Sequence, residues 1–448
     1  MKNKRRLFLK NMVFAGAAAT LAPSVFAKEP ETINFLERKI SNSGNLKTLK
    51  IALIGAGGMG SSDTNTALMH ENIELVAVCD LYDGRLDDAK NKWGSDLYLT
   101  KNYKDVLKRS DIDAVIIGTP DFWHKKISID ALNAGKHVYC EKPMIHNIDE
   151  GQDIIKAWKK SGKIMMVGSQ GMSSLGNEKA KELLAAGAIG ELNYAEGFWA
   201  RNSAIGAWQY PIPQDASTET VDWQKYISIS KDRPFDPLRF FRWRNYLDYG
   251  TGMAGDLFVH LFSSLHFITN SLGPNKIAAT GGLRYWEDGR EVPDVLLGMF
   301  DYPESKQHPA FNLSLRCNFV DGTSGSTYLK IVGSKGSMDV EWDRVTLKRN
   351  AGGESDDPFF AEKAKEESSR PNRKKMVPPL ETVYEAQDGY KGAHYDHFAN
   401  FFTAIRDNGS VAEDPIFGFR AAAPALLCNE SYKKDEFIEW DPKNMKMV

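Results

Sequence analysis

The sequence has few cysteines, almost no net charge and no long apolar run beyond its first residues. Its four cysteines lie far apart and form no CxxC pair, which argues against a zinc ribbon or a disulfide framework. A formal net charge of −2 provides no overall field for nucleic acid or an anionic membrane, so we expect neither as a partner. No window after residue 27 reaches the roughly 18 apolar residues of a membrane span, and we find no internal repeats.

The overall amino-acid composition is typical of a soluble globular protein. Apolar residues make up 42% of the chain and charged residues 26%, which excludes disorder as the main state. At roughly 150 residues per domain, the 448 residues leave room for two or three domains.

Residues 1–27 have the form of an export signal. Basic residues precede a short apolar run, and a small-residue cleavage site stands at residues 25–27; the run is too short to cross a bilayer. The segment RRLFLK at residues 5–10 resembles a twin-arginine signal, which exports proteins already folded, although a Sec signal with two arginines has the same general form. We therefore expect export to the periplasm, with residues 28–48 as a polar connector.

A glycine-rich loop follows the first expected strand. Residues 49–54 read LKIALI, and GAGGMG follows at residues 55–60, ahead of a helical window. This placement of G-x-G-x-x-G between a strand and a helix predicts a dinucleotide site, because the glycines permit a tight turn, close approach of the backbone to a pyrophosphate, and close packing of helix on strand. The expected cofactor-binding residues of the loop are Gly55, Gly57, Gly58, Met59 and Gly60.

An acidic residue ends the second expected strand. Residues 73–79 read IELVAVC and Asp80 follows, at the spacing where a carboxylate meets the ribose hydroxyls of a dinucleotide. A carboxylate there repels a 2′-phosphate, so the sequence favours NAD over NADP. Arg85 is close enough to weaken that preference without reversing it.

Further short apolar runs alternate with helical windows. Strands are expected at residues 114–117, 137–140 and 164–168. The alternation predicts an α/β fold with a doubly wound parallel sheet, a Rossmann domain over residues 49–170, whose ligands gather at the carboxyl ends of the strands. The residues expected to face the cofactor at these ends are Thr119, Pro120, Glu141 and Lys142, with His124 either lining the same crevice or serving a structural role.

Lys142 and the pair Asp256 and His260 are the expected catalytic residues. Lys142 follows a strand in the motif CEKP, where an ammonium group can polarise a developing alkoxide or ketone. Asp256 and His260 are four residues apart in the stretch YGTGMAGDLFVH, so on a helix they share one face. The aspartate would then orient the imidazole and raise its basicity, which suits proton abstraction from a sugar hydroxyl; a surface ion pair is the alternative.

These motifs together resemble the Gfo/Idh/MocA oxidoreductase family, which includes relatives of glucose–fructose oxidoreductase and inositol dehydrogenase. The resemblance rests on the glycine loop, TPDFWH at residues 119–124, GKHV at 135–138 and EKP at 141–143. It implies that Lys142 is a catalytic-site residue and that Asp256 and His260 contact the substrate, with the histidine as base. Phe258, where a glycine is common, and Ser263, where a further acid often lies, depart from the family pattern and leave the substrate open.

Much of the second half of the chain has the sequence pattern of consecutive β-strands. Strands are expected at residues 192–200, 276–283, 295–300, 311–319, 326–332 and 337–342. They predict a C-terminal α+β domain over residues 171–448 with a large, mostly antiparallel open sheet, and the charged residues 350–392 are expected to form an exposed insert. The resemblance implies that the substrate lies between the domains and that the protein forms a homo-oligomer, a dimer or tetramer.

Other side chains are weaker candidates. Arg242, Trp243 and Tyr249 form a candidate carbohydrate surface, because aromatic rings pack on sugar faces and arginines hold hydroxyls; a packed loop is the alternative. His394 and His397 have a spacing seen in metal sites, but no carboxylate or cysteine set completes one, so we expect no metal.

The expected reaction is hydride transfer between NAD and a carbon of a sugar, polyol or glycoside. If no free NAD exists outside the cytoplasm, an exported enzyme must hold its cofactor tightly. One alternative is a redox-neutral glycoside hydrolase of this family, which oxidises, eliminates, hydrates and reduces; that branch typically lacks the lysine that this chain keeps as Lys142. A second alternative is a non-catalytic sugar-binding protein with a relict nucleotide site, which the presence of Lys142, Asp256 and His260 disfavours.

Overall fold

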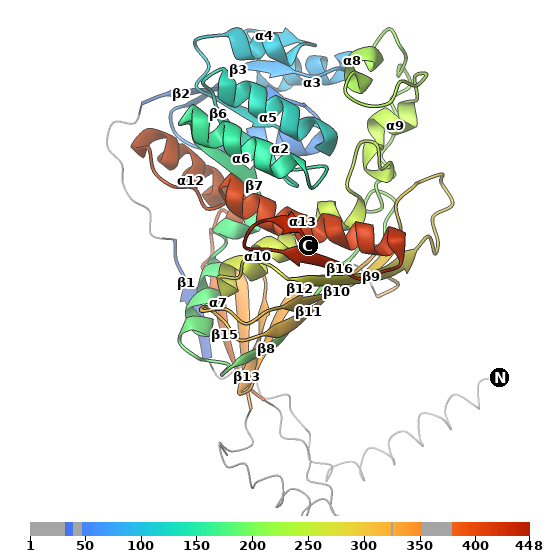
Figure 1. Ribbon diagram of the computed structural model, residues 1–448. Helices are drawn as coiled ribbons and strands as arrows, with labels where there is room; N and C mark the ends of the chain where they lie inside the picture. Colours follow the sequence, from blue (N-terminus) through green and yellow to red (C-terminus); the bar gives the residue numbers. More distant parts are fainter. Residues whose placement is uncertain (1–31, 39–46, 324–325, 351–378) are drawn as a thin grey trace, which may run out of the picture.

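Two β-sheets with helices around and between them make up the protein (Figure 1). The computed structural model describes residues 32–38, 47–323, 326–350 and 379–448, so the expected signal at residues 1–27 lies outside the described part. Within those ranges, none of the helices combines the length and the apolar character needed to cross a membrane.

The first sheet is parallel throughout, with the strand order β4-β3-β2-β5-β6-β7. A parallel sheet covered on both faces requires continuous apolar strands, and the runs AVII and MMVG are buried at every position. Its strands are β2 (Leu49–Ile54), β3 (Ile73–Cys79), β4 (Tyr98–Thr100), β5 (Ala114–Ile117), β6 (His137–Glu141) and β7 (Met165–Gly168).

Helices cover both faces of this sheet, and one of them comes from the far end of the chain. The local helices are α2 (Gly58–Ala67), α3 (Asp83–Trp93), α4 (Tyr103–Lys108), α5 (His124–Asn133) and α6 (Glu150–Ser161). Helix α12 (Ala393–Asp407) buries three phenylalanines in the same core cluster as one face of β2; the members of this contact are Phe398, Phe401 and Phe402 from α12 and Leu49, Ile51 and Leu53 from β2. The expected domain boundary at residue 170 divides the chain by sequence order. Helix α12 lies after that boundary in the sequence but packs on the first sheet.

The second sheet has eleven strands in the order β1-β15-β14-β13-β12-β8-β11-β10-β9-β16-β17. Only the pairs β1–β15 and β8–β11 are parallel, so the expected fold class is confirmed. Its strands are β1 (Thr32–Leu36), β8 (Leu192–Ala200), β9 (Lys276–Gly282), β10 (Val295–Tyr302), β11 (Phe311–Asn318), β12 (Thr327–Gly333), β13 (Gly336–Val340), β14 (Arg344–Arg349), β15 (Leu380–Ala386), β16 (Ile438–Asp441) and β17 (Lys446–Met447).

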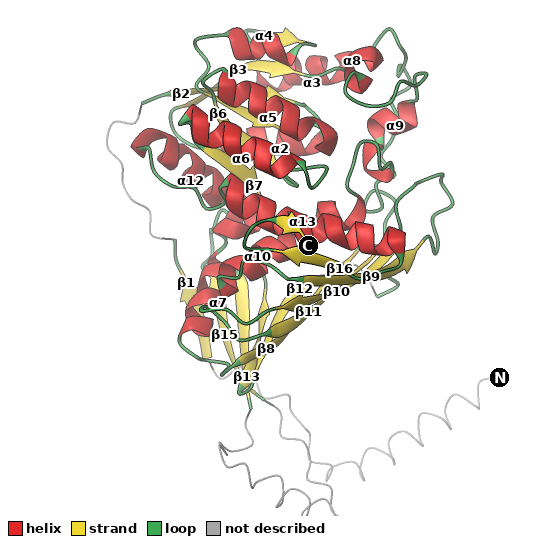
Figure 2. Cartoon of the chain, viewed as in Figure 1, coloured by secondary structure: helices red, strands yellow, loops and turns green. Residues whose placement is uncertain are grey.

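A layer of helices separates the two sheets (Figure 2). It consists of α7 (Leu175–Ala185), α10 (Val259–Thr269) and α13 (Pro415–Lys434). The opposite face of the large sheet is open, as strand β10 shows: Leu296 and Phe300 are buried, whereas Leu297 and Met299 point outward with 43% and 63% of their surface exposed.

Two expectations about irregular segments need correction. The expected connector at residues 28–48 contains β1, and the expected insert at residues 350–392 contains β15, which pairs with β1 in register from Thr32 opposite Thr382. The two strands are some 350 residues apart in the chain and are short and partly polar, so neither has a local signal that separates it from a loop. Residues 351–378 of the expected insert lie outside the described residues.

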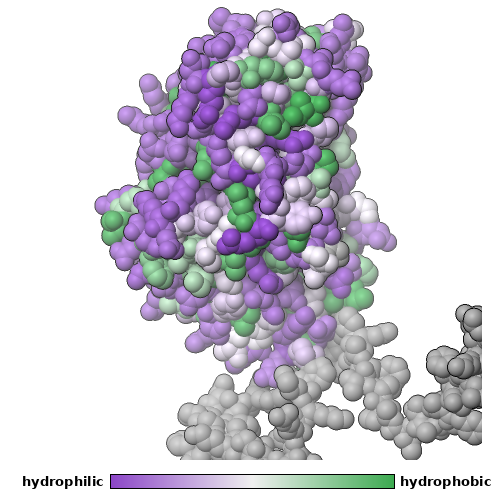
Figure 3. Space-filling view, turned by 90° about the vertical axis from the view of Figure 1, so that its right-hand side faces the viewer, coloured by the Kyte–Doolittle hydropathy of each residue, from purple (hydrophilic) through white to green (hydrophobic). Residues whose placement is uncertain are grey.

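The crossing segment, residues 201–250, leaves the large sheet after β8 and reaches the Rossmann domain. It carries the short helices α8 (Trp223–Ile227) and α9 (Pro237–Phe241). Val221 pairs with Tyr82 in an antiparallel bridge, and the backbone N–H of Asp83 donates to Thr220 at 3.0 Å. The side of the molecule with α8 and α9 is mostly hydrophilic, with apolar residues in small scattered patches (Figure 3).

Candidate active site

The glycine loop is shaped by close backbone contacts. Gly55 has a φ of +94°, in the region that favours glycine, and a Cβ there would stand 2.7 Å from the backbone of Gly118. A Cβ on Gly60 would stand 2.1 Å from the carbonyl oxygen of Gly55. Gly57 is different, because its Cβ would meet nothing nearer than the Arg85 guanidinium at 3.8 Å. Packing therefore requires Gly55 and Gly60, whereas the space beside Gly57 is free for a ligand.

Asp80 holds the loop in place. Its carboxylate is buried and accepts hydrogen bonds from the backbone N–H groups of Ala56 at 2.8 Å and Tyr82 at 3.0 Å. Arg85 lies beside it, with Nη1 3.5 Å from Oδ1. Each carboxylate oxygen has two lone pairs, so Asp80 retains acceptor capacity toward the cavity that it lines.

A cavity of about 640 Å³ runs from the glycine loop to Lys142, Asp256 and His260. Its roof comes from the crossing segment, which contributes aromatic and basic side chains; these include Trp208, Tyr210, Tyr226, Phe240, Phe241, Trp243 and Arg244. The N-terminus of α2 opens into it at Gly57 and Gly58, where helix N–H groups favour a phosphate. The open space at Gly57, the free acceptor capacity of Asp80 and the length of the cavity fit a dinucleotide such as NAD.

Lys142, Asp256 and Arg244 form a charged cluster at the inner end of this cavity. Lys142 Nζ donates to the Asp256 carboxylate at 2.8 Å and to the Asp256 carbonyl at 2.9 Å. Arg244 Nε donates to the same carboxylate at 3.2 Å. Burial acts to raise the pKa of Asp256, but these two cations outweigh it and hold the pKa below its ordinary value. Two cations against one carboxylate leave the cluster with a net positive charge.

His260 does not form the expected pair with Asp256. A π-helical turn, Ala254–Phe258, precedes α10 and changes the register between the two residues. The Asp256 carboxylate turns to its cations, and the His260 ring stacks on Trp199 at 5.3 Å between ring centroids. Neither ring nitrogen has a hydrogen-bond partner among the described residues, and Nδ1 is sealed from solvent, so Nε2 is the nitrogen available to a ligand.

The expected rise in the basicity of His260 is therefore wrong. Burial and the nearby charge of Lys142 lower the pKa of His260 to about 3. The Asp256 charge acts in the opposite direction but does not compensate. At neutral pH His260 is an uncharged ring that can accept a hydrogen bond from a substrate.

The pH profile of the reaction is expected to lack a histidine limb. A group with a lowered pKa keeps its neutral form until the pH approaches that value, so His260 stays neutral from pH 5 to pH 9. We expect no fall of kcat/KM near pH 6.5, the ordinary histidine value. The measurement is the profile of the wild type beside His260→Gln; a limb near 6.5 that disappears in the variant would contradict this assignment.

The other expected cofactor residues divide into two groups. Thr119 and Pro120 line the cavity. His124 is buried and is not among the lining residues, and its ring nitrogens lie 2.8 Å from the Pro143 carbonyl and 2.9 Å from the Thr119 carbonyl, a placement that favours its structural alternative. Glu141 is also buried outside the cavity, where it accepts a hydrogen bond from Gln170 at 2.8 Å; the strand alternation turns it away from the ligand side.

Of the expected carbohydrate surface, only Trp243 lines the cavity. Arg242 donates to the carbonyl of Tyr210, and Tyr249 is fully buried in an aromatic cluster with Phe122. Both follow the packed-loop alternative. Four further lining residues were not expected from the sequence: Trp199, Arg201, Trp208 and Tyr210. The interleaving of tryptophan and arginine was the available signal, but it does not say which ring faces inward.

The histidines considered as metal ligands have other partners. His394 Nε2 lies 2.9 Å from Asp63, and His397 contacts Ser173 and the Val167 carbonyl at 2.8 Å and 2.9 Å. Across the described ranges no three His, Cys, Asp or Glu side chains gather in a way that could hold a metal ion.

Comparison with known proteins identifies both halves of the chain. The profile described as oxidoreductase family, NAD-binding Rossmann fold, matches residues 49–169, and that of the family's C-terminal alpha/beta domain matches residues 181–439.

Inositol 2-dehydrogenase from Salmonella typhimurium is 31% identical over 166 residues, 37% of this chain and 49% of that protein. Alpha-N-acetylgalactosaminidase from Shewanella oneidensis is 28% identical over 239 residues, 50% of each chain. The chain thus spans about half the length of the curated relatives it matches. Among solved structures, levoglucosan dehydrogenase in complex with NADH and levoglucosan has a TM-score of 0.62 at 19% identity, covering 88% of this chain and 99% of that one.

Proposed function

Since the chain belongs to the Gfo/Idh/MocA oxidoreductase family and has its NAD-binding Rossmann domain, we propose that it transfers a hydride between NAD and a hydroxyl-bearing carbon of a sugar, polyol or glycoside. The observation that carries the proposal is the Lys142–Asp256–Arg244 cluster, which shares one cavity with the glycine loop. The expected family and the expected cofactor are confirmed; the substrate class is the proposal.

The cluster suits the charge that develops in such a reaction. NAD, when bound, supplies the acceptor or donor of the hydride. Lys142 is held by Asp256 and presents an ammonium group to the substrate oxygen, where it stabilises the developing alkoxide. Arg244 helps to keep the Asp256 carboxylate ionised. Lys142 therefore keeps its counter-ion, and the second cation leaves the cluster positively charged as a whole. His260 accepts the hydrogen bond of the substrate hydroxyl through Nε2 and takes its proton as the hydride leaves, and Trp199 holds the ring by stacking.

We also propose NAD rather than NADP as the cofactor. Asp80 is buried at the cavity wall with a negative charge that a 2′-phosphate would oppose. Arg85 lies 3.5 Å from that carboxylate and packs over Phe240 and Phe241, which leaves its charge partly committed. Both groups together favour the ribose hydroxyls over a phosphate.

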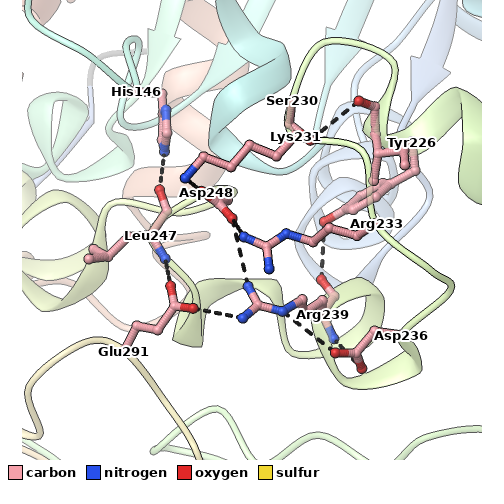
Figure 4. A network of polar contacts seen from close by, with 11 residues as sticks. His146, Tyr226, Ser230, Lys231, Arg233, Asp236, Arg239, Leu247, Asp248 and Glu291 are labelled. Atoms are coloured by element: carbon pink, nitrogen blue, oxygen red, sulfur yellow. Dashed lines mark hydrogen bonds and ion pairs between the residues drawn. The ribbon is translucent and has the colours of Figure 1, made fainter.

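The crossing segment supports a tightly held cofactor. The segment covers the cavity. On the side of the Rossmann domain, Asp215 of the segment accepts a hydrogen bond from the hydroxyl group of Tyr82 at 2.7 Å. A polar network fastens its near end (Figure 4): Arg239 bridges Asp248 and Glu291, and Glu291 accepts from the backbone N–H of Leu247. A segment fixed at both ends slows release of a bound dinucleotide, which is what an exported enzyme requires.

A redox-neutral glycoside hydrolase is the second candidate. The relative from Shewanella oneidensis bears a glycosidase name, and its match extends over more of the chain than the match to inositol 2-dehydrogenase. Lys142 favours the oxidoreductase, since the resemblance implies that the hydrolase branch typically lacks this lysine. We keep the oxidoreductase as the main proposal and locate it in the periplasm on account of residues 1–27.

One experiment separates the two candidates. Protein lacking residues 1–27 is desalted extensively and given a panel of sugars and aryl glycosides without added NAD, and turnovers per bound cofactor are counted. We expect a single burst of reduced nicotinamide that resumes when NAD or a second sugar is supplied. Many turnovers with release of the aglycone would identify the hydrolase, and the absence of both signals with every compound would contradict both candidates.

The oligomeric state is part of the proposal. The outward side chains Leu297 and Met299 on β10 and Ile33 and Phe35 on β1 are exposed on the large sheet. Exposed apolar residues on a sheet favour association, and we propose a homo-oligomer, a dimer or tetramer as in the family.

A further inference from the structure

Gln170 is a buried polar residue that lines the active-site cavity. It begins the short helical turn Gln170–Ser173, just after the carboxyl end of β7. Its side-chain Nε2 donates to Glu141 at 2.8 Å, and Glu141 directly precedes Lys142 in the chain. Ligands of a parallel sheet gather at the carboxyl ends of its strands, so Gln170 lies at the end of the cavity where the reaction takes place.

The carbonyl oxygen of the Gln170 side chain is free to accept a hydrogen bond. Because Nε2 donates to Glu141, the orientation of the amide group is set. Among the described residues no donor reaches Oε1, and Oε1 is not one of the buried atoms that are closed off without a partner. Since the residue lines the cavity, this oxygen is an acceptor available to a ligand there.

The Glu141 carboxyl group is itself held by Asp63 of helix α2. Both side chains are buried, and they form a hydrogen bond with each other. Two carboxyl groups make such a bond only when one of them carries a proton, because an ionised carboxylate has no donor. Burial raises the pKa of Asp63 above its ordinary value and that of Glu141 to about 8, which keeps a proton in the pair at neutral pH.

Packing around this pair fixes it further. A Cβ at Gly168, the last residue of β7, would stand 2.4 Å from Oε1 of Glu141, so the strand closely approaches the oxygen that receives Gln170. Asp63 Oδ1 lies 2.9 Å from Nε2 of His394, whose side chain is 24% exposed. A row of polar groups, His394–Asp63–Glu141–Gln170, therefore runs from the surface of α12 to the cavity, and each member orients the next.

We propose that Gln170 is a substrate-binding residue and that Glu141 and Asp63 are positioning residues that hold its amide group. Oε1 of Gln170 accepts a hydrogen bond from a hydroxyl group of the sugar or polyol other than the one that is oxidised. The inference rests on the proposed function for the reaction at Lys142. This hydrogen bond is the same in the ground state and the transition state, so it acts on KM rather than on kcat.

Deoxy sugars test the contact at Gln170. The probes are glucose, galactose and their monodeoxy derivatives, measured for oxidation by the NAD-loaded enzyme and for binding to the NADH-loaded enzyme by titration calorimetry. Gln170→Leu should raise the KM of the better sugar about tenfold, the effect of one lost hydrogen bond, and change kcat by less than about threefold. For the deoxy derivative that lacks the contacting hydroxyl, the wild type and the variant should have the same KM, because the bond is already absent.

Variants of Glu141 test the positioning role. Glu141→Leu removes the partner of the Gln170 amide and should raise the KM of the sugar as far as Gln170→Leu does, with no further rise when the two changes are combined. Glu141→Gln keeps an oxygen for Gln170 and supplies an N–H for Asp63, so it should recover most of the affinity that Glu141→Leu loses. A role in stability alone would not produce this dependence on one sugar hydroxyl.

Gln152→Leu is the matched control. Gln152 is exposed on α6 and does not line the cavity, so its replacement should leave the KM of every sugar unchanged. The proposal is overturned if Gln170→Leu leaves the KM unchanged, or if it weakens a sugar and all of its deoxy derivatives equally. Weaker binding of NAD by Gln170→Leu, with unchanged binding of sugars, would assign Oε1 to the nicotinamide amide and would also overturn it.

The same measurements separate this inference from the proposed function. If the binding of a sugar depends on Gln170 but no sugar is oxidised, the contact stands and the proposed function fails. If a sugar is oxidised with a KM that does not depend on Gln170, the proposed function stands and the contact is excluded. If none of the sugars binds or reacts, both are contradicted.

Discussion

Replacing Lys142 by methionine should lower kcat about 100- to 1,000-fold, the usual effect of removing a group that stabilises a developing oxyanion. Methionine keeps the volume of the side chain but removes the ammonium group that lies 2.8 Å from Asp256. The fold should persist, because Asp256 retains Arg244 at 3.2 Å. Binding of NAD should also persist, because the glycine loop is at the other end of the cavity. The measurement is single-turnover reduction of bound NAD, with binding followed by calorimetry.

Lys126→Met is the matched control for this variant. Lys126 lies on α5 with 42% of its side chain exposed and pairs with Asp130 at 2.9 Å, a surface ion pair of small energetic value. It should leave both kcat and NAD binding unchanged. Unaltered activity of Lys142→Met on every substrate, together with normal NAD binding, would remove Lys142 from the chemistry and overturn its assignment as a catalytic residue.

Gly57→Ala should weaken NAD binding about 10- to 100-fold, the equivalent of one or two lost charge-assisted hydrogen bonds. The added methyl group would stand in the space between Gly57 and Arg85, with 3.8 Å to the guanidinium. That space is open in the protein itself, so the free energy of unfolding should change little. A pyrophosphate that approaches the backbone there would meet the methyl group. Calorimetric titration with NAD and thermal unfolding measure the two quantities.

Gly409→Ala controls for the general effect of adding a methyl group. A Cβ at Gly409 would meet only Ala404, at 3.9 Å, and the residue is remote from the cavity. It should leave both quantities unchanged. Gly60→Ala would be a poor substitute for Gly57→Ala, because its Cβ would stand 2.1 Å from a carbonyl oxygen and would disturb the loop itself. Normal NAD affinity in Gly57→Ala would exclude this loop as the pyrophosphate site.

The histidine shows where local spacing misleads. A spacing of four residues predicts that Asp256 and His260 share a helix face, but the π-helical turn inserts extra backbone and the carboxylate meets Lys142 and Arg244 instead. Lys142 precedes Asp256 by 114 residues, and no pattern in the sequence connects the two. Their attraction in a buried site decides the orientation of Asp256, and it leaves His260 to its aromatic neighbours.

The aromatic lining of the cavity also could not be predicted from local sequence patterns. The crossing segment is rich in tryptophan, tyrosine and arginine, which the sequence displays plainly. Whether Trp243 or Tyr249 faces a ligand depends on how the segment packs between the sheets, and that packing buries Tyr249 completely. Phe122 and Tyr226, which contact its ring, come from different parts of the chain.

The sequence by itself determined the Rossmann domain, its glycine loop and the position of Asp80, because each depends on residues that are neighbours in the chain and on a short strand–turn–helix unit. It also determined most strands of the second sheet through their alternating pattern. Only the tertiary structure decided the pairing of β1 with β15, the return of α12 to the first sheet, and the Lys142–Asp256–Arg244 cluster. These contacts join segments far apart in the chain, and they form where burial and opposite charge bring them together, which no local pattern records.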